Sequence, residues 1–123
     1  MKIANSKDFI GIICEDKPAM IFFHYKDEEN DAKKIKAVLK ELHKDFPLLS
    51  SYEYIIDDND DNLLLAQHLD VSKTPILVFY KDGCFNRYKD KYFNKKTLGV
   101  FIGSKRLYGK PAKEKETKQE TTI

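Results

Sequence analysis

Two cysteines and a run of acidic residues are the groups in this sequence that most readily suggest chemistry. Cys14 and Cys84 lie far apart, and their spacing matches no zinc, haem or dithiol redox motif. The polar N-terminal stretch lacks the apolar core of a secretory signal, so a cytoplasmic location is expected, where thiols stay reduced. We therefore expect Cys14 to be an inert, partly buried thiol at a helix end and Cys84 to be exposed and oxidisable.

The acidic segment Asp57–Asn62 invites comparison with a calcium-binding loop, because oxygen ligands recur at alternate positions. An EF-hand loop also needs Gly at its sixth position and Glu at its twelfth, where this sequence has Asn62 and His68. The segment is better explained as a solvated loop that caps the next helix. His24, His43 and His68 have neither a histidine four residues away nor a cysteine partner, so the sequence predicts no metal site and no cofactor.

The bulk composition limits both the size and the partners of the protein. A chain of 123 residues has room for one packed domain, predicted here over residues 1–108, and a tail. The tail, residues 109–123, is rich in Lys, Glu and Thr without apolar periodicity and is expected to be disordered. The formal net charge of +2 argues against a nucleic-acid binder, and no apolar run reaches the roughly 20 residues that cross a bilayer.

Hydrophobic periodicity divides the chain into alternating strands and helices. The clearest helix begins at Ala32 and ends before Pro47, with an apolar stripe of Ile35, Leu39 and Leu42, and the polar residues 24–31 before it predict a loop. The predicted strands are Met1–Ala4, Ala19–Phe23, Tyr52–Ile56, Pro75–Tyr80 and Phe85–Tyr88. The predicted helices are Asn5–Cys14, Ala32–Phe46, Leu63–Leu69 and Lys95–Leu107. This order predicts an α/β fold in which helices cover both faces of a central sheet.

The segment Leu65–Gly83 carries a resemblance to a known family. It combines a short helix, a turn ending in Thr74–Pro75, an apolar strand and a Lys-Asp-Gly turn, and in this it resembles the thioredoxin family. The likeness covers nearly all of residues 2–107 and implies a three-layer α/β/α thioredoxin-like fold with a mixed sheet of four to five strands and four helices. It also implies that Pro75 is cis and that the backbone of Thr74 is free to hydrogen-bond an extended peptide. A trans proline that simply starts the strand is the alternative.

The catalytic residues of that family are missing at the matching positions. Its C-x-x-C motif at the start of the long helix matches four residues without a thiol: Glu29, Asn30, Asp31 and Ala32. Glu28 stands where the family has a tryptophan, Phe23 where it has a buried acid, and Lys91 where it has a glycine-rich turn. By this resemblance the chain lacks dithiol–disulfide exchange. The acidic residues complement the positive end of the helix dipole instead, with Asn30 or Asp31 as the cap.

These observations favour a redox-inactive thioredoxin-like domain that serves as a protein- or peptide-binding module or adaptor rather than as an enzyme. The predicted groove beside Pro75 consists of Tyr25, Glu28, Lys73, Thr74, Pro75 and Lys91. Its acidic loop favours a basic partner, either a protein or an extended peptide, and no nucleic-acid or membrane partner is expected. Two alternatives remain: a divergent thiol–disulfide oxidoreductase that uses Cys84 with an external thiol, and a structural subunit of a larger assembly.

Overall fold

The computed structural model describes residues 1–15, 17–71, 73–88 and 93–107. The strands are β1 (Lys2–Ile3), β2 (Ala19–His24), β3 (Ser50–Ile55), β4 (Ile76–Lys81) and β5 (Cys84–Tyr88). The helices are α1 (Ser6–Cys14), α2 (Glu29–Asp45), α3 (Asp60–His68) and α4 (Lys95–Lys105). Two short 3₁₀ turns, η1 (Lys26–Glu28) and η2 (Ile56–Asp58), precede α2 and α3.

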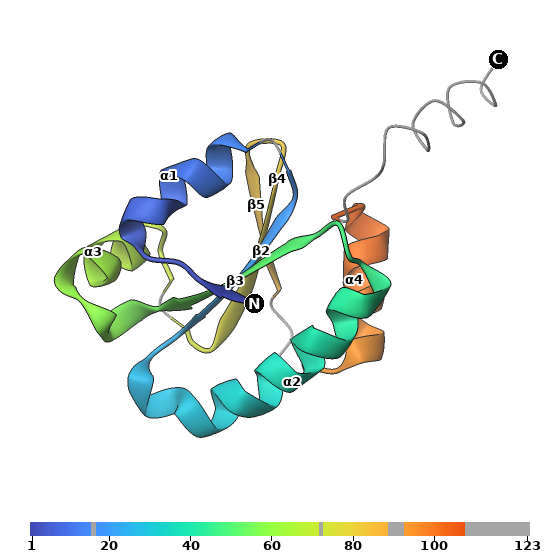
Figure 1. Ribbon diagram of the computed structural model, residues 1–123, viewed down its shortest axis with the longest axis horizontal. Coiled ribbons are helices and arrows are strands. Elements are labelled where there is room, and N and C mark those ends of the chain that lie inside the picture. The colour runs from blue at the N-terminus through green and yellow to red at the C-terminus, as the bar shows by residue number, and fades with distance from the viewer. Residues whose placement is uncertain (16, 72, 89–92, 108–123) are drawn as a thin grey trace, which may run out of the picture.

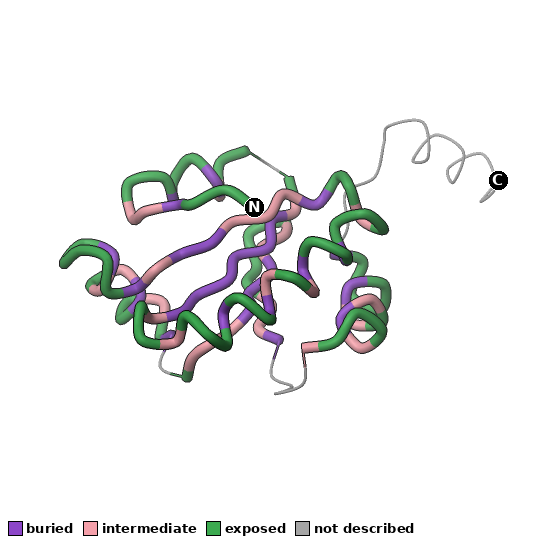
Figure 2. Tube along the Cα trace, turned by 60° about the horizontal axis from the view of Figure 1, so that its bottom comes forward, coloured by how far each residue is buried: buried purple, intermediate pink, exposed green. Residues whose placement is uncertain are grey.

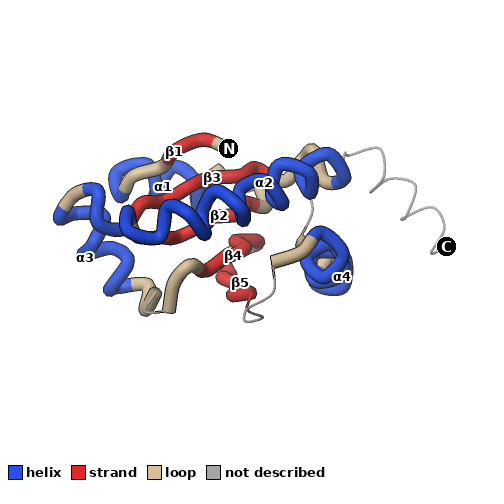
Figure 3. Tube along the Cα trace, turned by 90° about the horizontal axis from the view of Figure 1, so that it is seen from below, coloured by secondary structure: helices blue, strands red, loops and turns tan. Residues whose placement is uncertain are grey.

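The strands form one five-stranded sheet in the order β1-β3-β2-β4-β5. β3 is parallel to both β1 and β2, whereas β4 is antiparallel to β2 and to β5. α1 and α3 lie on one face of this mixed sheet and α2 and α4 lie on the other (Figure 1). In the view from below, α2 crosses β2 and β3, and α4 lies near β4 and β5 (Figure 3). The predicted three-layer architecture with a mixed sheet and four helices is confirmed.

β2 lies at the centre of the sheet because its side chains are suited to burial on both faces, as a strand covered by helices on each side requires. All of its residues are buried, and Figure 2 shows burial concentrated along the central strands. Met20 and Phe22 belong to the core beneath α2 and α4, while Ile21 and Phe23 belong to the core beneath α1 and α3. This alternation follows from the two-residue period of a strand.

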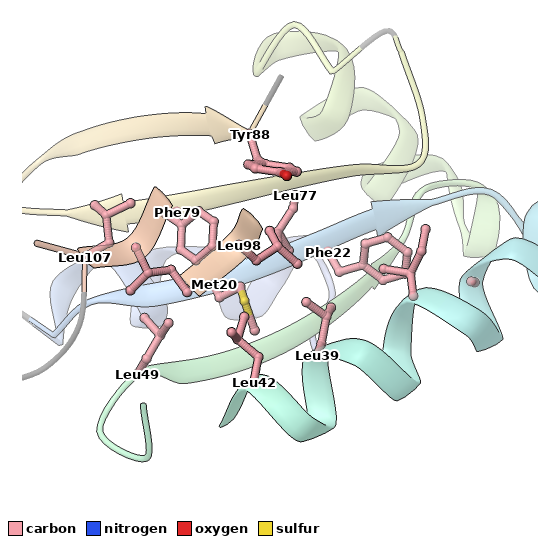
Figure 4. Close-up of a cluster of buried hydrophobic side chains, with 13 residues drawn as sticks. Met20, Phe22, Leu39, Leu42, Leu49, Leu77, Phe79, Tyr88, Leu98 and Leu107 are labelled. Atoms are coloured by element: carbon pink, nitrogen blue, oxygen red, sulfur yellow. The ribbon is translucent and has the colours of Figure 1, made fainter. Parts of the chain in front are cut away.

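The core beneath α2 and α4 fixes the position of α2 against the sheet. Ile35, Leu39 and Leu42 recur along one face of the helix, and the last two are each only 1% exposed. Figure 4 shows Leu39 and Leu42 projecting from α2 into the cluster that contains Met20 and Leu98. Each such side chain contributes about 1.5–3 kcal/mol on burial, so this packing holds the whole of α2, including its first turn, at a fixed place beside the sheet.

Most element boundaries differ from the sequence prediction by one or two residues, and three differences have a clear physical reason. β2 continues to His24, where the sequence predicts a loop, because the polar ring of His24 has a hydrogen-bonded partner inside the protein. α2 begins at Glu29 rather than Ala32, since an exposed first turn needs no apolar stripe. α3 begins at Asp60, so the acidic segment is a 3₁₀ turn and a helix start rather than a single loop. The cap itself is Asn59, whose side chain accepts the N–H of Asn62 at 2.8 Å.

The turn between β4 and β5 places Asp82 and Gly83 at positive φ angles of 51° and 80°. Glycine adopts this conformation without a steric penalty, and two such residues suit the twist of a tight hairpin. The predicted hairpin is confirmed.

No helix within the described ranges is both long enough and apolar enough to span a membrane. The tail predicted over residues 109–123 lies outside those ranges.

Candidate functional site

The candidate site lies at the end of the sheet where β2 stops and β4 begins. The last paired residues of these antiparallel strands are Phe23 and Ile76, so Tyr25 follows on one strand and Thr74 precedes on its neighbour. This register places Tyr25 and the Thr74–Pro75 turn at the same end of adjacent strands. The peptide bond between Thr74 and Pro75 is cis, the isomer that the resemblance implied.

Thr74 has main-chain groups that the rest of the described chain does not use. No described residue donates a hydrogen bond to its carbonyl or accepts one from its N–H. Thr74, Pro75 and Ile76 are all partly exposed, so these groups are not sealed inside the core. Every backbone N–H and C=O has a strong hydrogen-bonding requirement, and at Thr74 the described residues do not meet it.

The first turn of α2 holds the four residues that match the family's cysteine motif. Glu29, Asn30 and Asp31 are exposed, whereas Ala32 is fully buried in the core. The carboxylates of Glu29 and Asp31 lie at the positive end of the helix dipole, which stabilises negative charge. The predicted cap by Asn30 or Asp31 is wrong, because both residues lie inside the helix and Glu28 occupies the N-cap position.

Glu28 has a structural role at the entry to α2. Its carboxylate accepts the backbone N–H of Tyr25 at 2.8 Å, and its own N–H donates to the Tyr25 carbonyl at 3.1 Å. Lys26 ties the same turn to the neighbouring loop: its N–H donates to Asp57 at 2.9 Å, and its ammonium group pairs with Asp58 at 3.5 Å. The turn between β2 and α2 is therefore held in one conformation at the end of the sheet.

The acidic residues around this turn leave unpaired negative charge at the surface. Asp27, Glu29 and Asp31 are exposed, and no described Lys or Arg lies within ion-pair distance of any of them. Lys73, the residue before Thr74, is an exposed cation. Lys91, the remaining member of the predicted groove, lies outside the described residues.

Neither thiol lies at this end of the sheet. Cys84 pairs with Lys81 at the far end of β4, roughly 20 Å from Pro75 for a strand that rises about 3.3 Å per residue. Cys14 ends α1 shortly before Ala19, the first residue of β2, which is also at the far end of the sheet. In the described part of the chain, no group of three or more His, Cys, Asp or Glu side chains is arranged to hold a metal ion.

Both thiols are free and exposed, so the predicted partial burial of Cys14 is wrong. The reason is helical geometry. Phe9 and Ile12 form the buried face of α1, and Cys14 follows two residues after Ile12, about 200° around a helix with 3.6 residues per turn. Its side chain therefore lies on the solvent side.

A buried polar network lies between the sheet and the first half of α2, next to the candidate site. His24 is fully buried, and its Nε2 lies 2.6 Å from Oε2 of Glu53 on β3. Its Nδ1 lies 2.9 Å from the carbonyl oxygen of Tyr25. Lys36 of α2 donates to the same Glu53 oxygen at 3.0 Å. The sequence prediction missed this network. The sequence contained a sign of it: His24 ends one apolar strand and Glu53 lies inside the next. Ionisable residues are rarely buried without partners, so two of them in strands predicted to be buried indicate a pair.

The partners determine the protonation state of this network. Burial disfavours the charged form of Glu53, but the hydrogen bonds from His24 and Lys36 outweigh it and hold the pKa of Glu53 below its ordinary value. The carbonyl of Tyr25 can only accept, so Nδ1 of His24 carries a proton. Nε2 lies 2.6 Å from Oε2 of Glu53, so a short hydrogen bond joins the two buried side chains.

Phe23 occupies the strand position at which the thioredoxin resemblance places a buried acid. It is 1% exposed and packs against Tyr54 with ring centroids 4.9 Å apart. The buried ionisable pair of this chain lies on the opposite face of β2, beneath α2, because neighbouring residues of a strand point to opposite faces. Phe23 offers no group that could accept a proton at the candidate site.

The solved structures that resemble this chain include thioredoxins from three organisms. Thioredoxin O2 from Arabidopsis thaliana is 20% identical with a TM-score of 0.66, and the match covers 87% of this chain and 93% of that one. Fasciola hepatica thioredoxin is 25% identical with a TM-score of 0.62, covering 85% and 98% respectively. Mitochondrial thioredoxin 3 from Saccharomyces cerevisiae is 19% identical with a TM-score of 0.69, covering 85% and 94%. No protein-family model and no curated protein matches the sequence.

The chain has the thioredoxin fold, and the resemblance seen in the sequence is confirmed at that level. The matches extend over most of both chains, so the fold accounts for nearly all of the described residues. The cysteine pattern is a property of this sequence itself: its two cysteines are Cys14 and Cys84, and the first turn of α2 contains neither.

Proposed function

We propose that this protein is a redox-inactive thioredoxin-fold binding module that holds an extended, basic peptide or protein segment at the end of β2 and β4. One observation carries the proposal: the unpartnered main chain of Thr74 lies beside a helix start that has carboxylates where thiols would act. Dithiol exchange needs a thiolate stabilised at such a helix start. This helix start has no thiolate, and what it has beside it, a free main chain at Thr74 and exposed acidic side chains, suits the binding of an extended peptide.

Main-chain pairing supplies the first part of the proposed affinity. An extended peptide binds a free backbone edge through its own N–H and C=O groups, and its alternate side chains provide specificity. Thr74 has a donor and an acceptor available for this pairing. Tyr25 and Pro75, both partly exposed, form apolar walls on either side, and Lys73 stands at the rim. Glu28 supports the groove indirectly, because its carboxylate holds the turn that positions Tyr25.

Electrostatic attraction supplies the second part. Asp27, Glu29 and Asp31 are exposed and have no described cation within ion-pair distance, so they attract Lys or Arg side chains of the bound segment. Exposed charges of this kind are screened beyond about 8 Å at physiological ionic strength. Binding is therefore expected to weaken as salt concentration rises.

A displayed library of random peptides, selected against the full chain, tests the proposal. The selected peptides are expected to be rich in Lys and Arg and to move the backbone amide signal of Thr74 in ¹⁵N NMR spectra. Reversing both Glu29→Lys and Asp31→Lys is expected to weaken the best peptide about tenfold, which corresponds to about 1.4 kcal/mol. Glu15→Lys is the control for overall charge, with half the change in charge of the double reversal, since Glu15 is an exposed acid that follows α1 at the far end of the sheet.

Two results would overturn the proposal. One is a set of selected peptides that leaves the Thr74 amide unmoved. The other is a loss of about threefold in Glu15→Lys, half the free-energy loss of the double reversal, because a loss in proportion to the change in charge means that only the overall charge of the protein matters.

The exposure of Cys84 favours a second candidate function, thiol–disulfide exchange with an external thiol. Cys84 lies in the β4–β5 hairpin, away from both a helix N-terminus and the Thr74 turn, so it lacks the helix-start position that dithiol exchange uses. The free state of both cysteines is compatible with a reducing, cytoplasmic environment. We therefore rank this candidate below peptide binding.

A further inference from the structure

A second recess lies along α2, away from the Thr74 turn. It is open to solvent and lined by residues of α2, of β1 and of the start of β3, and its volume is about 560 Å³. That volume falls within the range of pockets that hold small organic ligands. Leu39 and Leu49 line it with apolar surface and also belong to the core beneath α2. The recess shares no residue with the groove beside Thr74.

The polar lining of this recess is basic. Lys36, Lys40 and His43 follow one another on one side of α2, and Lys2 lines the recess from β1. Within the described part of the chain, none of the lining residues is Asp or Glu. Lys36 pairs with Glu53, whereas Lys2 and Lys40 have no described carboxylate within ion-pair distance. Like charges four residues apart on a helix repel one another, so an anion bound among them relieves this repulsion.

Ser51 adds an unused polar group to the wall of the recess. Its hydroxyl oxygen is buried and has no hydrogen-bond partner among the described residues. Ser51 and Glu53 are alternate residues of β3, so both side chains point to the α2 face of the sheet. Buried hydroxyl groups are ordinarily paired, so the hydroxyl of Ser51 is a group with which a ligand in the recess could form a hydrogen bond.

We propose that the recess binds an organic anion that joins an apolar body to a phosphate or carboxylate group. The anionic group lies among Lys2, Lys40 and His43, and the apolar body lies against Leu39 and Leu49. Lysine ammonium groups bind phosphate as mobile point charges, and an apolar wall favours a ligand with an apolar part over a bare ion. The two binding sites are independent, and either proposal can fail without the other.

Titration of the ¹⁵N-labelled full chain with three probes tests this site. The probes are 1-naphthyl phosphate, which has both parts of the proposed ligand, 1-naphthol, which has only the body, and inorganic phosphate. We expect 1-naphthyl phosphate to move the amide signals of residues 36–43 and 49–52 and to bind at least about tenfold more tightly than either of the other probes. Sodium chloride at about 0.5 M should weaken its binding, since screening acts on exposed charges.

Charge reversals locate the anionic group. Lys40→Glu and Lys2→Glu, on two different elements, are each expected to weaken 1-naphthyl phosphate about tenfold or more. Lys34→Glu is the matched control, because Lys34 is an exposed residue of α2 outside the recess, and it should change the affinity less than about twofold. All three positions are exposed, so the variants are expected to fold, and their far-ultraviolet circular dichroism checks this.

Four results would overturn the proposal. Binding of 1-naphthol or of inorganic phosphate as tight as that of 1-naphthyl phosphate would remove the need for one part of the ligand. Signals that move only outside residues 36–43 and 49–52 would place the site elsewhere. Equal losses of affinity in Lys40→Glu and Lys34→Glu would mean that only the overall charge of the protein affects binding. Tighter binding of a decaglutamate peptide would make the recess a surface for acidic proteins.

Discussion

Replacing Glu53 by Gln tests the buried network between the sheet and α2. Glu53 is 7% exposed and His24 is 0% exposed. One carboxylate oxygen of Glu53 accepts from His24 at 2.6 Å and from Lys36 at 3.0 Å. Glu53→Gln keeps the shape of the side chain and removes its charge. The hydrogen bonds that join Glu53 to His24 and to Lys36 then lose their charged carboxylate.

We expect Glu53→Gln to lower the free energy of unfolding by about 3 kcal/mol at neutral pH. A hydrogen bond to a charged group contributes about 1.5–3 kcal/mol, and removing one partner of a buried ion pair costs about 3–5 kcal/mol. The lower end of the second range applies because the side chain of Lys36 is 30% exposed and can turn to water once its partner has lost the charge.

The same network gives the stability a pH dependence at the acidic end. The folded-state pKa of Glu53 lies below its ordinary value of 4.5. Ionised Glu53 therefore contributes stability that is fully present above that value and is lost as the pH falls through the folded-state pKa. The glutamine variant has no such group to protonate. The difference in stability between wild type and Glu53→Gln should accordingly narrow as the pH falls below 4.5 and through the lower folded-state pKa of Glu53.

Urea unfolding followed by circular dichroism, at several pH values, measures both effects. Glu41→Gln is the matched control, since Glu41 pairs with Lys44 at 3.1 Å but the two side chains are 54% and 66% exposed. The control should change stability by less than about 0.5 kcal/mol. A loss below about 1 kcal/mol in Glu53→Gln, or a difference that stays constant in acid, would refute the assigned ion network.

Three further results are expected. Asn62→Ala should cost about 2–4 kcal/mol in thermal unfolding, because Asn62 is fully buried and its removal leaves the N–H of Ser6, now 2.8 Å from the Asn62 oxygen, without an acceptor. Leu42→Ala should cost about 2–5 kcal/mol in urea, whereas Leu48→Ala, at a side chain 50% exposed, should cost less than about 1 kcal/mol. In an insulin-reduction assay with a thioredoxin reductase we expect no turnover above background, and turnover abolished by Cys84→Ser would establish the alternative function.

The apolar strands and most of α2 were predictable because burial imposes a regular pattern on sequence. Ala19–Phe23 is a continuous apolar run, which a central strand with helices on both faces requires. The stripe of α2 is visible for the same reason. The start of α2 at Glu29 was predicted almost one turn too late, because three of the first four residues face solvent and carry no apolar period. Acidic residues are favourable in the first turn of a helix, but they also occur in loops, so they mark the start of α2 only once the helix itself is known.

The candidate site was predictable where its residues are close in sequence. The Thr74–Pro75 turn and the substituted start of α2 each belong to a short segment that could be compared with a family. The pair of His24 and Glu53 joins two strands across 29 positions, and only the register of β2 and β3 brings the side chains together. The basic recess has the same origin, since Lys2 reaches it from β1 and Lys40 from α2.

The charges of α2 contribute to stability as well as to the two proposed sites. Its first turn carries Glu29 and Asp31, whose negative charge complements the positive end of the helix dipole. Each such group contributes about 0.3–1 kcal/mol. Reversing both acids therefore weakens the helix whether or not a basic peptide binds there.

The loss of helix stability does not obscure the binding result, because its effect on the apparent affinity is much smaller than the expected tenfold loss of binding. A domain with about 5–15 kcal/mol of stability remains more than about 99% folded after losing about 2 kcal/mol. Partial unfolding of that extent lowers the apparent affinity by only about 1%. A tenfold loss of peptide affinity in the Glu29→Lys, Asp31→Lys variant, with the urea midpoint still well above zero, must therefore come from the bound state itself. Only an unpredicted loss of more than about 5 kcal/mol would allow unfolding to imitate it.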